Sequence, residues 1–566
     1  MTAPANADRN VQFHGQSRCR QDGALRESST RTSRLQSVSV FRAANRTSRL
    51  PRRTYLAQIP RLGRVLDTAR CSDTLATMVD DAVNPHSVRS GPLLWVPLVP
   101  ASIALATYTL TLSPEVGPGD AAELALQAHR LGVTHPPGSP VHTILGHLFQ
   151  FVVSDPARAT NYLSAFTTAV AVGLLSGMIL TITRQRLIAF IAPLGFAFLP
   201  TVWESAVSTE VYNVSIGFVA AAMFVTLKWY GRRSARRALL AGVLVGLSFG
   251  TSLANILLLP GWCVLVWRRS RGRGGDLALA LTGAILVGIL VLSWAVFRSR
   301  SHPPLGTEYL PHRAADLWAY VTAAQYRTPR SLPLAFYVER LWEHGRLFSA
   351  SFLWLGLVVA LVGLKFLWTR HRWIALAMIL MFVMNMAYFT WYPWPDYYEM
   401  VTPSYFITML AFAAGVESLH RWKGKARVDM LAKAVTIIVV ATLLTTGLKD
   451  HLSRKGQTPV TDMVKASFEM FPPDAVVVSA WDTFAAMLYF QEVHGLRTDL
   501  RIVEWSGRAR NYKWGTVADS TAFAVRSSSA RPVFVEHLDR VLVESCVLQA
   551  ASPNWIRVVQ CDASSE

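Results

Sequence analysis

Long runs of apolar residues, separated by short polar segments, dominate the chain between residues 92 and 448. A helix of about 20 apolar residues is long enough to cross the hydrocarbon core of a bilayer. The pattern predicts about eleven transmembrane helices, at 92–112, 160–183, 187–203, 211–229, 238–252, 253–267, 277–297, 348–368, 373–392, 401–419 and 432–448. The predicted fold class is therefore mainly α, a polytopic membrane protein.

Basic clusters set the predicted orientation of these spans. Residues 238–267 are long enough for one helix, but arginine clusters flank them on both sides. Splitting them into two spans places the four basic loops on the inner side, as the positive-inside rule requires. These predicted inner loops are 230–237, 268–276, 369–372 and 420–427. The apolar piece 141–153 is too short for an ordinary span and is predicted to be an interfacial helix. The outer segments are then 113–159, 204–210, 298–347, 393–400 and everything after 449.

The two ends of the chain differ from the apolar middle. Residues 1–77 are rich in Arg and Ser and are predicted to be a disordered tail, and whether the mature protein keeps them is left open. After residue 449, β-rich runs at 475–479, 500–504 and 532–536 alternate with a helical segment at 483–493, which predicts a small extracytoplasmic α/β domain with three strands. The predicted domains are 1–77, a transmembrane domain at 78–448, and 449–566.

Composition supports a multi-pass protein of the cell membrane. Of the 566 residues, 51% are hydrophobic and only 16% are charged. The net charge of +20 lies mostly in the tail and between apolar runs, which argues for membrane lipids as partners and against nucleic acid. Cysteine spacing suggests no metal site. Cys546 and Cys561 could form a disulfide in an extracytoplasmic domain or could remain free thiols.

The first outer loop carries two carboxylates at helical spacing. Gly117-Pro118-Gly119 breaks any earlier helix, and the residues that follow are strongly helix-prone, so Asp120 and Glu123 share one helix face. In a structural interpretation, Asp120 is the N-cap and Glu123 completes a capping box. In a functional interpretation, this helix start presents a reactive carboxylate, because charges beside membrane spans are usually functional. Spacing alone leaves both alternatives open.

Other polar residues of the outer loops also have two interpretations. The sequence His135-Pro136-Pro137-Gly138 predicts an extended stretch and a tight turn, either a stiff connector or a frame that holds His135 over a site. Arg298 directly follows an apolar run. It either reaches the lipid headgroups or clamps the phosphate of a lipid substrate.

Two further outer segments combine carboxylates with aromatic rings. Trp203, Glu210 and Tyr212 lie around a short outer hairpin, and Asp396 and Tyr398 lie in a late loop crowded with Trp and Tyr. Such aromatic rings form an interfacial belt in many membrane proteins. Aromatic rings beside carboxylates are equally suited to bind sugars, and the two alternatives stay open here.

These motifs together resemble a known membrane family. The pattern Asp120-Ala-Ala-Glu123-Leu124, followed by Leu131-Gly-Val-Thr-His135-Pro-Pro-Gly138, is similar to the first outer loop of the protein O-mannosyltransferase-like family, domain of unknown function 2723, which includes transmembrane protein 260. Trp203, Ala206 and Glu210-Val-Tyr212 resemble its second motif. The likeness extends over about residues 92–510 and departs from the family pattern at Ala122, Ser252 and Met400.

The resemblance implies a GT-C-type glycosyltransferase. Enzymes of this type take a sugar from a polyprenyl-phosphate donor on the outer face and use a carboxylate of the first outer loop. The implied reaction is inverting transfer of a sugar, mannose in this family, to a Ser, Thr or glycan hydroxyl. The implied roles are a catalytic base for Asp120 with help from Glu123, donor-phosphate binding for Arg130, His135 and Arg298, and substrate binding for Trp203, Glu210, Tyr212, Asp396 and Tyr398.

Two other classes of protein remain open at this point. A transporter or lipid flippase would use the same carboxylates to couple ions, but the chain shows no repeated halves and its charges sit at span ends. A non-catalytic envelope scaffold would tolerate the loss of Asp120 and Glu123 together. The sequence leaves the sugar, the acceptor protein or glycan, the lipid length, any divalent metal requirement and the oligomeric state undetermined.

Overall fold

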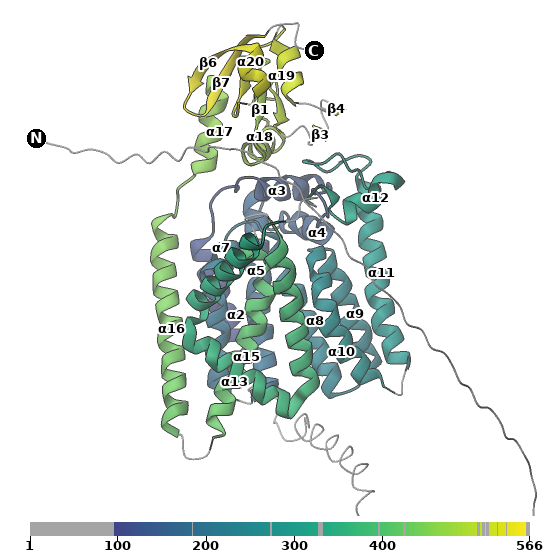
Figure 1. Cartoon of the computed structure of the whole chain (residues 1–566), viewed down its shortest axis with the longest axis vertical. Helices are drawn as coiled ribbons and strands as arrows, with labels where there is room; N and C mark the ends of the chain where they lie inside the picture. The colour runs from purple at the N-terminus through teal and green to yellow at the C-terminus, as the bar shows by residue number, and fades with distance from the viewer. Residues whose placement is uncertain are drawn as a thin grey trace, which may run out of the picture. The chain divides into compact units, whose positions relative to one another are not determined.

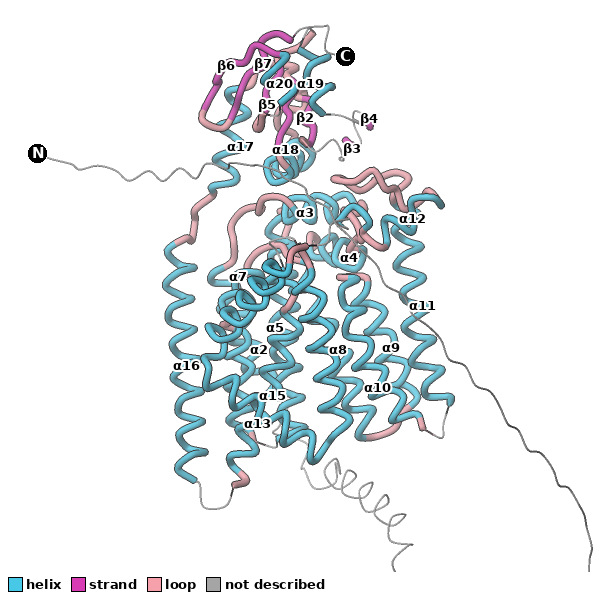
Figure 2. The backbone as a smooth tube through the Cα atoms, in the orientation of Figure 1, coloured by secondary structure: helices cyan, strands magenta, loops and turns pink. Residues whose placement is uncertain are grey.

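The computed structural model describes residues 95–561, apart from 184, 272–273, 327–331, 394–396, 423–425, 506–509, 512–514, 517–519, 529 and 539. The predicted tail at 1–77 and the candidate residue Asp396 lie outside the described residues. Most of the described chain is helical, and its strands are confined to the C-terminal part (Figure 2).

The membrane part consists of helices up to residue 453 (Figure 1). They are α2 (Trp95–Thr111), α3 (Asp120–Arg130), α4 (Pro140–Phe149), α5 (Pro156–Thr183), α6 (Arg186–Ala197), α7 (Pro200–Ala206), α8 (Val211–Gly231), α9 (Ala235–Phe249), η2 (Leu253–Leu258), α10 (Leu259–Ser270), α11 (Gly274–Arg298), α12 (Ala314–Val321), η3 (Ala324–Tyr326), α13 (Leu334–Trp391), α14 (Tyr397–Met400), α15 (Thr402–His420) and α16 (Ala426–Ser453).

Each predicted span coincides with helix in the structure, but the number of membrane crossings stays a prediction. Five described helices are long and apolar enough to cross a membrane, or six if α6 and α7, which are bent by 70° at their junction, form one span. The 58 residues of α13 cover two predicted spans. Its backbone leaves helical geometry at His371, inside the predicted inner loop, and also at Leu353, inside the predicted span 348–368. The predicted interfacial helix is α4.

The basic loops that are predicted to be inner lie close to one another in the structure. Arg233 donates a hydrogen bond to the carbonyl of Arg269 at 2.9 Å, which joins the loops that flank α9 and α10. The guanidinium of Arg268 lies 5.8 Å from the ring centroid of Trp373, beside the kink in α13. The guanidinium of Arg421 lies 5.8 Å from the ring centroid of Phe366, which also belongs to α13. These contacts place the four loops at the same end of the bundle.

The C-terminal part contains a mixed sheet covered by helices. Its elements are α17 (Pro459–Met470), β1 (Val476–Ser479), α18 (Trp481–His494), β2 (Arg501–Glu504), β3 (Arg510–Asn511), β4 (Gly515–Thr516), α19 (Ser520–Ser528), β5 (Val533–Val535), α20 (Arg540–Ser545), β6 (Cys546–Ser552) and β7 (Trp555–Cys561). The main sheet has the order β2-β1-β5-β7-β6, in which β1 pairs in parallel with β2 and β5. The three predicted strands are β1, β2 and β5, whereas sequence reasoning missed the β6–β7 hairpin, where Cys546 and Cys561 are disulfide-bonded.

One apolar core joins the C-terminal part to the first outer loop. Ala122 and Ala125 of α3 belong to the same buried cluster as Phe484 and Leu488 of α18. The carboxylate of Glu115 adds a polar link, because it accepts the backbone N–H groups at the start of α17 at 3.2 and 2.8 Å. The two carboxylates of the outer loop therefore lie on a helix that packs against α18.

Candidate active site

The helix α3 begins at Asp120, the predicted catalytic base. Gly119 precedes it with φ = 55°, a left-handed conformation that favours glycine. Asp120 is the first helical residue, and no side chain caps the helix start. The structural alternative, in which Asp120 is the N-cap and Glu123 completes a capping box, is therefore wrong. The oxygens of Glu123 bind His135 instead.

Glu123 and His135 form a buried pair. Glu123 has no exposed surface, and only 19% of the His135 side chain is exposed. The backbone N–H of His135 donates to Oε1 of Glu123 at 2.9 Å, and Nδ1 of the ring is hydrogen-bonded to Oε2. Both oxygens of Glu123 are thus occupied in fixing the backbone and the ring of His135.

Asp120 is the more accessible of the two carboxylates. Its side chain is 48% exposed, and its Oδ2 lies 3.7 Å from Nε2 of His135. Its other oxygen, Oδ1, accepts a hydrogen bond of 2.7 Å from the indole N–H of Trp481 in α18. The imidazole of His135 therefore lies between a buried carboxylate and an accessible one.

Burial and charge act together on the ionisation of this pair. Burial raises the pKa of Glu123, while the nearby imidazole of His135 opposes that rise. Burial alone would lower the pKa of His135, but Asp120, Tyr326 and Glu123 raise it well above its ordinary value. The acidic neighbours of the ring therefore favour its protonated form.

The His-Pro-Pro-Gly segment is a tight turn, as predicted. Gly138 has φ = 84°, and its backbone N–H donates to the carbonyl of His135 at 2.8 Å. Tyr320, which is buried, donates its hydroxyl to the carbonyl of Thr134 at 2.8 Å. A residue of the 298–347 segment therefore stabilises the turn at the position next to His135.

The two arginines expected to bind the donor phosphate lie at the opposite end of α3. Arg298 donates to the carbonyls of Leu131 and Arg130 at 2.7 and 2.9 Å. It thus satisfies carbonyls that the end of a helix leaves unpaired. Burial, with the charges of Arg298 and Arg130, lowers the pKa of nearby His302. Phosphate binding by either arginine stays a prediction.

The remaining predicted site residues that the structure describes make contacts of other kinds. Trp203 is buried, donates to the hydroxyl of Thr111 at 3.0 Å and stacks on His451 with ring centroids 5.0 Å apart. Glu210 precedes α8, where its backbone N–H donates to the hydroxyl of Ser164 at 3.1 Å. Tyr212 lies in the first turn of α8, and the ring of Tyr398 lies 6.2 Å from that of Tyr397. Sugar binding by these residues stays a prediction.

Sequence reasoning missed three residues around Asp120 and His135. The ring of Tyr326 lies 6.3 Å and that of Trp481 5.9 Å from the imidazole, both edge to face. Asp482 follows Trp481, and partial burial, then Asp120 and Glu536, raise its pKa. One available signal was overlooked: Trp481-Asp482 directly follows the carboxyl end of a parallel strand, where α/β domains place ligand-binding residues.

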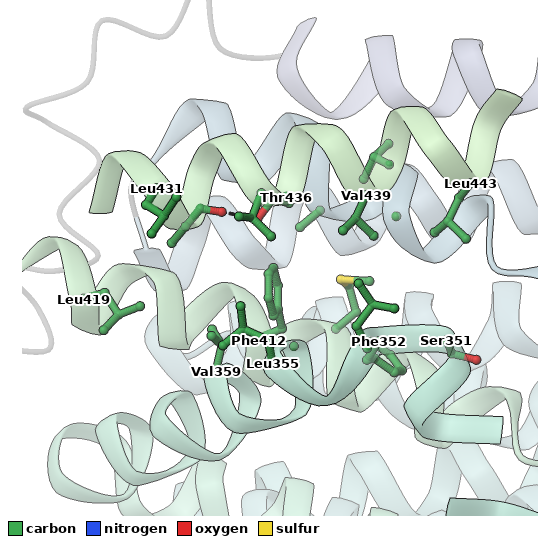
Figure 3. A pocket seen from close by; sticks show the side chains of 18 of the residues that line it. Ser351, Phe352, Leu355, Val359, Phe412, Leu419, Leu431, Thr436, Val439 and Leu443 are labelled. Carbon is green, nitrogen blue, oxygen red and sulfur yellow. Dashed lines mark hydrogen bonds between the residues drawn. The ribbon is translucent and has the colours of Figure 1, made fainter. Parts of the chain in front are cut away.

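A cavity in the helical bundle, away from the candidate active site, has no reactive groups in its lining. It has a volume of about 220 Å³ and lies between α6, α13, α15 and α16. Side chains from α16, such as Leu431 and Val439, face Phe412 and Leu355 across it (Figure 3). Its lining is apolar except for hydroxyls such as those of Ser351 and Thr436, so it suits a hydrocarbon chain and not a sugar.

The described side chains do not form a metal-binding group. No three His, Cys, Asp or Glu residues gather as ligands in the part of the chain that the structure describes. The pair of Glu123 and His135 with Asp120 supplies charge and hydrogen bonding from the protein itself, and any divalent metal requirement remains open.

The helical bundle with its C-terminal α/β part has the GT-C fold. The chain is similar in structure to ArnT from Cupriavidus metallidurans bound to undecaprenyl phosphate, with a TM-score of 0.54 at 12% identity, over 83% of this chain and 98% of that one. Residues 120–273 match the family model of the protein O-mannosyl-transferase TMEM260 N-terminal domain, which confirms the predicted resemblance for this segment.

Two relatives carry the same family name. The chain is 31% identical to the protein O-mannosyl-transferase TMEM260 of Mus musculus over 211 residues, which are 36% of this chain and 30% of that protein. It is 30% identical to the Dictyostelium discoideum protein O-mannosyl-transferase tmem260 over 130 residues, 22% of this chain and 16% of that protein. The match thus spans less than a third of either relative.

Proposed function

We propose that the protein is a membrane glycosyltransferase that moves a sugar from a polyprenyl-phosphate donor to a hydroxyl on the outer face. The sugar is mannose and the acceptor a Ser or Thr side chain. The observation that carries the proposal is the arrangement of Asp120, which is half exposed, beside the buried pair of Glu123 and His135. The GT-C fold and the relatives' names support the class of reaction.

In this reaction Asp120 is the general base. The acceptor hydroxyl attacks the anomeric carbon on the face opposite the lipid phosphate, and its proton passes to a carboxylate oxygen of Asp120. The bond between the sugar and the phosphate breaks, and the phosphate leaves with the lipid. Glu123 is a poorer base here, because it is buried and both its oxygens bind His135.

His135 lies between the two carboxylates and offers a donor to the leaving group. Its Nδ1 binds Glu123, whereas Nε2 lies 3.7 Å from Asp120, too far for a direct hydrogen bond. An imidazolium N–H in this position can donate to a phosphate oxygen and stabilise the charge that develops there. The apolar cavity beside α16 has room for part of a hydrocarbon chain.

The test is transfer of mannose from a synthetic polyprenyl-phosphate mannose to a peptide containing Ser and Thr, with the purified protein in lipid nanodiscs. General-base catalysis contributes about 10²- to 10⁴-fold, so Asp120→Asn should lower kcat by at least about 10²-fold. The matched control is Asp155→Asn, because the Asp155 carboxylate accepts the N–H of Arg158 at the start of α5.

The outcomes test the role of Asp120 and separate a glycosyltransferase from a transporter or flippase. Loss of transfer in Asp120→Asn, with unchanged thermal unfolding, supports the glycosyltransferase. Equal turnover by Asp120→Asn and wild type overturns Asp120 as the base. A wild-type protein that transfers no sugar but moves ions or lipid across a vesicle membrane would instead be a transporter or flippase.

A further inference from the structure

The side chain of Trp481 reaches from the C-terminal part into the candidate active site. Its indole N–H donates to Oδ1 of Asp120 at 2.7 Å, and its ring meets that of His135 edge to face at 5.9 Å. A Cβ atom on Gly306 would lie 2.6 Å from the indole ring, so the opposite loop passes close to it. Trp481 therefore contacts both the first outer loop and the 298–347 segment, which are far from it in sequence.

The first turn of α18 is fixed from two directions. Glu536, which follows β5, accepts the backbone N–H of Ala480 at 2.8 Å and the hydroxyl of Thr483 at 2.9 Å. On the other side, the backbone N–H of Gly119 donates to the carbonyl of Asp482 at 3.2 Å. A Cβ atom at Gly119 would collide with the carboxylate of Asp482. The start of α18 and the start of α3 thus form a close backbone contact.

The hydrogen bond from Trp481 restricts the orientation of the Asp120 side chain. A half-exposed carboxylate at the first position of a helix has no capping bond and can adopt several side-chain rotamers. The indole N–H engages one oxygen of the carboxylate and leaves the other for a proton. The neighbouring carboxylate of Asp482 would repel Asp120, and a hydrogen-bond donor on Asp120 offsets that repulsion.

We propose that Trp481 is a positioning residue of the transferase site, so that the C-terminal α/β part completes the active site in addition to any role in binding acceptors. The inference rests on the proposed function, because it assumes that Asp120 is the base. Trp481 does not touch the reacting atoms. It acts by holding the Asp120 carboxylate in the orientation that accepts the hydroxyl proton.

The test compares Trp481→Phe with Trp555→Phe. The first keeps an aromatic ring but loses the N–H that binds Asp120. The second loses an indole hydrogen bond of 3.0 Å to Ser467 within the C-terminal core, away from Asp120. We expect Trp481→Phe to lower kcat by about 10-fold, the effect of one charge-assisted hydrogen bond, with KM for the mannosyl donor and the peptide unchanged. Trp555→Phe should keep the wild-type kcat.

A second measurement does not depend on activity. Hydrogen–deuterium exchange of the 113–131 peptide reports the contact between α3 and α18. We expect faster exchange near Gly119 in Trp481→Phe than in wild type or in Trp555→Phe, because the first turn of α3 loses its side-chain hydrogen bond to α18 and keeps only the backbone and apolar contacts.

The two measurements distinguish the possible failures. A lower kcat at unchanged KM in Trp481→Phe alone supports the positioning role. Equal kcat in wild type and Trp481→Phe, or equal losses in both Trp variants, overturns it. If wild type transfers no mannose while Trp481→Phe still exchanges faster, the proposed function fails and the contact between the helices stands.

Discussion

At the scale of single residues, burial distinguishes two carboxylates that sequence spacing treats alike. Asp120 and Glu123 share one helix face, and the sequence offers no physical reason to prefer either as the base. In the structure Glu123 is fully buried and both its oxygens bind His135, whereas Asp120 remains 48% exposed. The difference arises because Glu123 packs under the His-Pro-Pro-Gly turn, a contact between residues 12 positions apart.

The charge of His135 makes a prediction about stability. Its pKa is raised well above the ordinary value of 6.5 by Asp120, Tyr326 and Glu123 against the effect of burial. A raised pKa stabilises the folded protein at low pH, and this contribution is lost as pH rises through the folded-state pKa. We therefore expect wild type to exceed His135→Gln in thermal stability most strongly below about pH 6.5, with the difference shrinking in alkaline buffer.

The measurement is thermal unfolding of both proteins in detergent from pH 6 to pH 10. His129→Gln is the control, because the ring of His129 also lies on α3 but contacts Gln150 at 3.1 Å outside the site. A stability difference between wild type and His135→Gln that stays constant or grows with pH would contradict an imidazolium held by the two carboxylates.

At the scale of elements, hydrophobic periodicity predicted the helices well, because spans of this length leave few alternatives in a membrane. The strands β1, β2 and β5 were predicted because each is a short β-rich run, whereas α17 and the β6–β7 hairpin were missed. The contact between Trp481 and Asp120 joins residues 361 positions apart. The position of Trp481 after a β-rich run could have marked it as a candidate site residue, but no local pattern encodes its pairing with Asp120.

The conformation of Gly138, in the turn after His135, predicts the effect of substituting this glycine. Gly138 has φ = 84°, and a Cβ atom there would collide with the hydroxyl of Tyr320. Gly138→Ala should therefore lose about 1–3 kcal/mol of unfolding free energy and reduce mannosyl transfer. Adding Tyr320→Phe should recover part of the stability, since it removes the atom that the new methyl group meets.

The control for this prediction is Gly456→Ala. Gly456 has φ = 83° with nothing within 4 Å of a Cβ atom, so its substitution measures the backbone strain alone. Denaturant unfolding of the single and double variants gives the coupling energy between Gly138→Ala and Tyr320→Phe. Strictly additive effects would show that the hydroxyl of Tyr320 does not limit the turn.

At the scale of the whole molecule, contacts between distant segments define two opposite ends of the helical bundle. The basic loops meet at one end, where Arg233 binds the carbonyl of Arg269 and Arg268 lies over Trp373. The acidic loop meets the C-terminal part at the other end, where α3 shares a buried core with α18. Whatever the number of spans, the acidic loop and the C-terminal part must therefore lie on the same side of the membrane.

Cysteine labelling tests this topology directly, in a background where Cys19, Cys71 and Cys263 are replaced by Ser. Cys546 and Cys561 do not interfere, because they are disulfide-bonded. Lys465→Cys in α17 and Arg236→Cys in α9 each replace an exposed basic residue, which makes them a matched pair. A membrane-impermeant maleimide should label Lys465→Cys in intact cells and Arg236→Cys only after permeabilisation, because basic loops face the cytoplasm. Labelling of both variants in intact cells would show that the basic loops do not face the cytoplasm. The reverse pattern would place the Asp120 site in the cytoplasm.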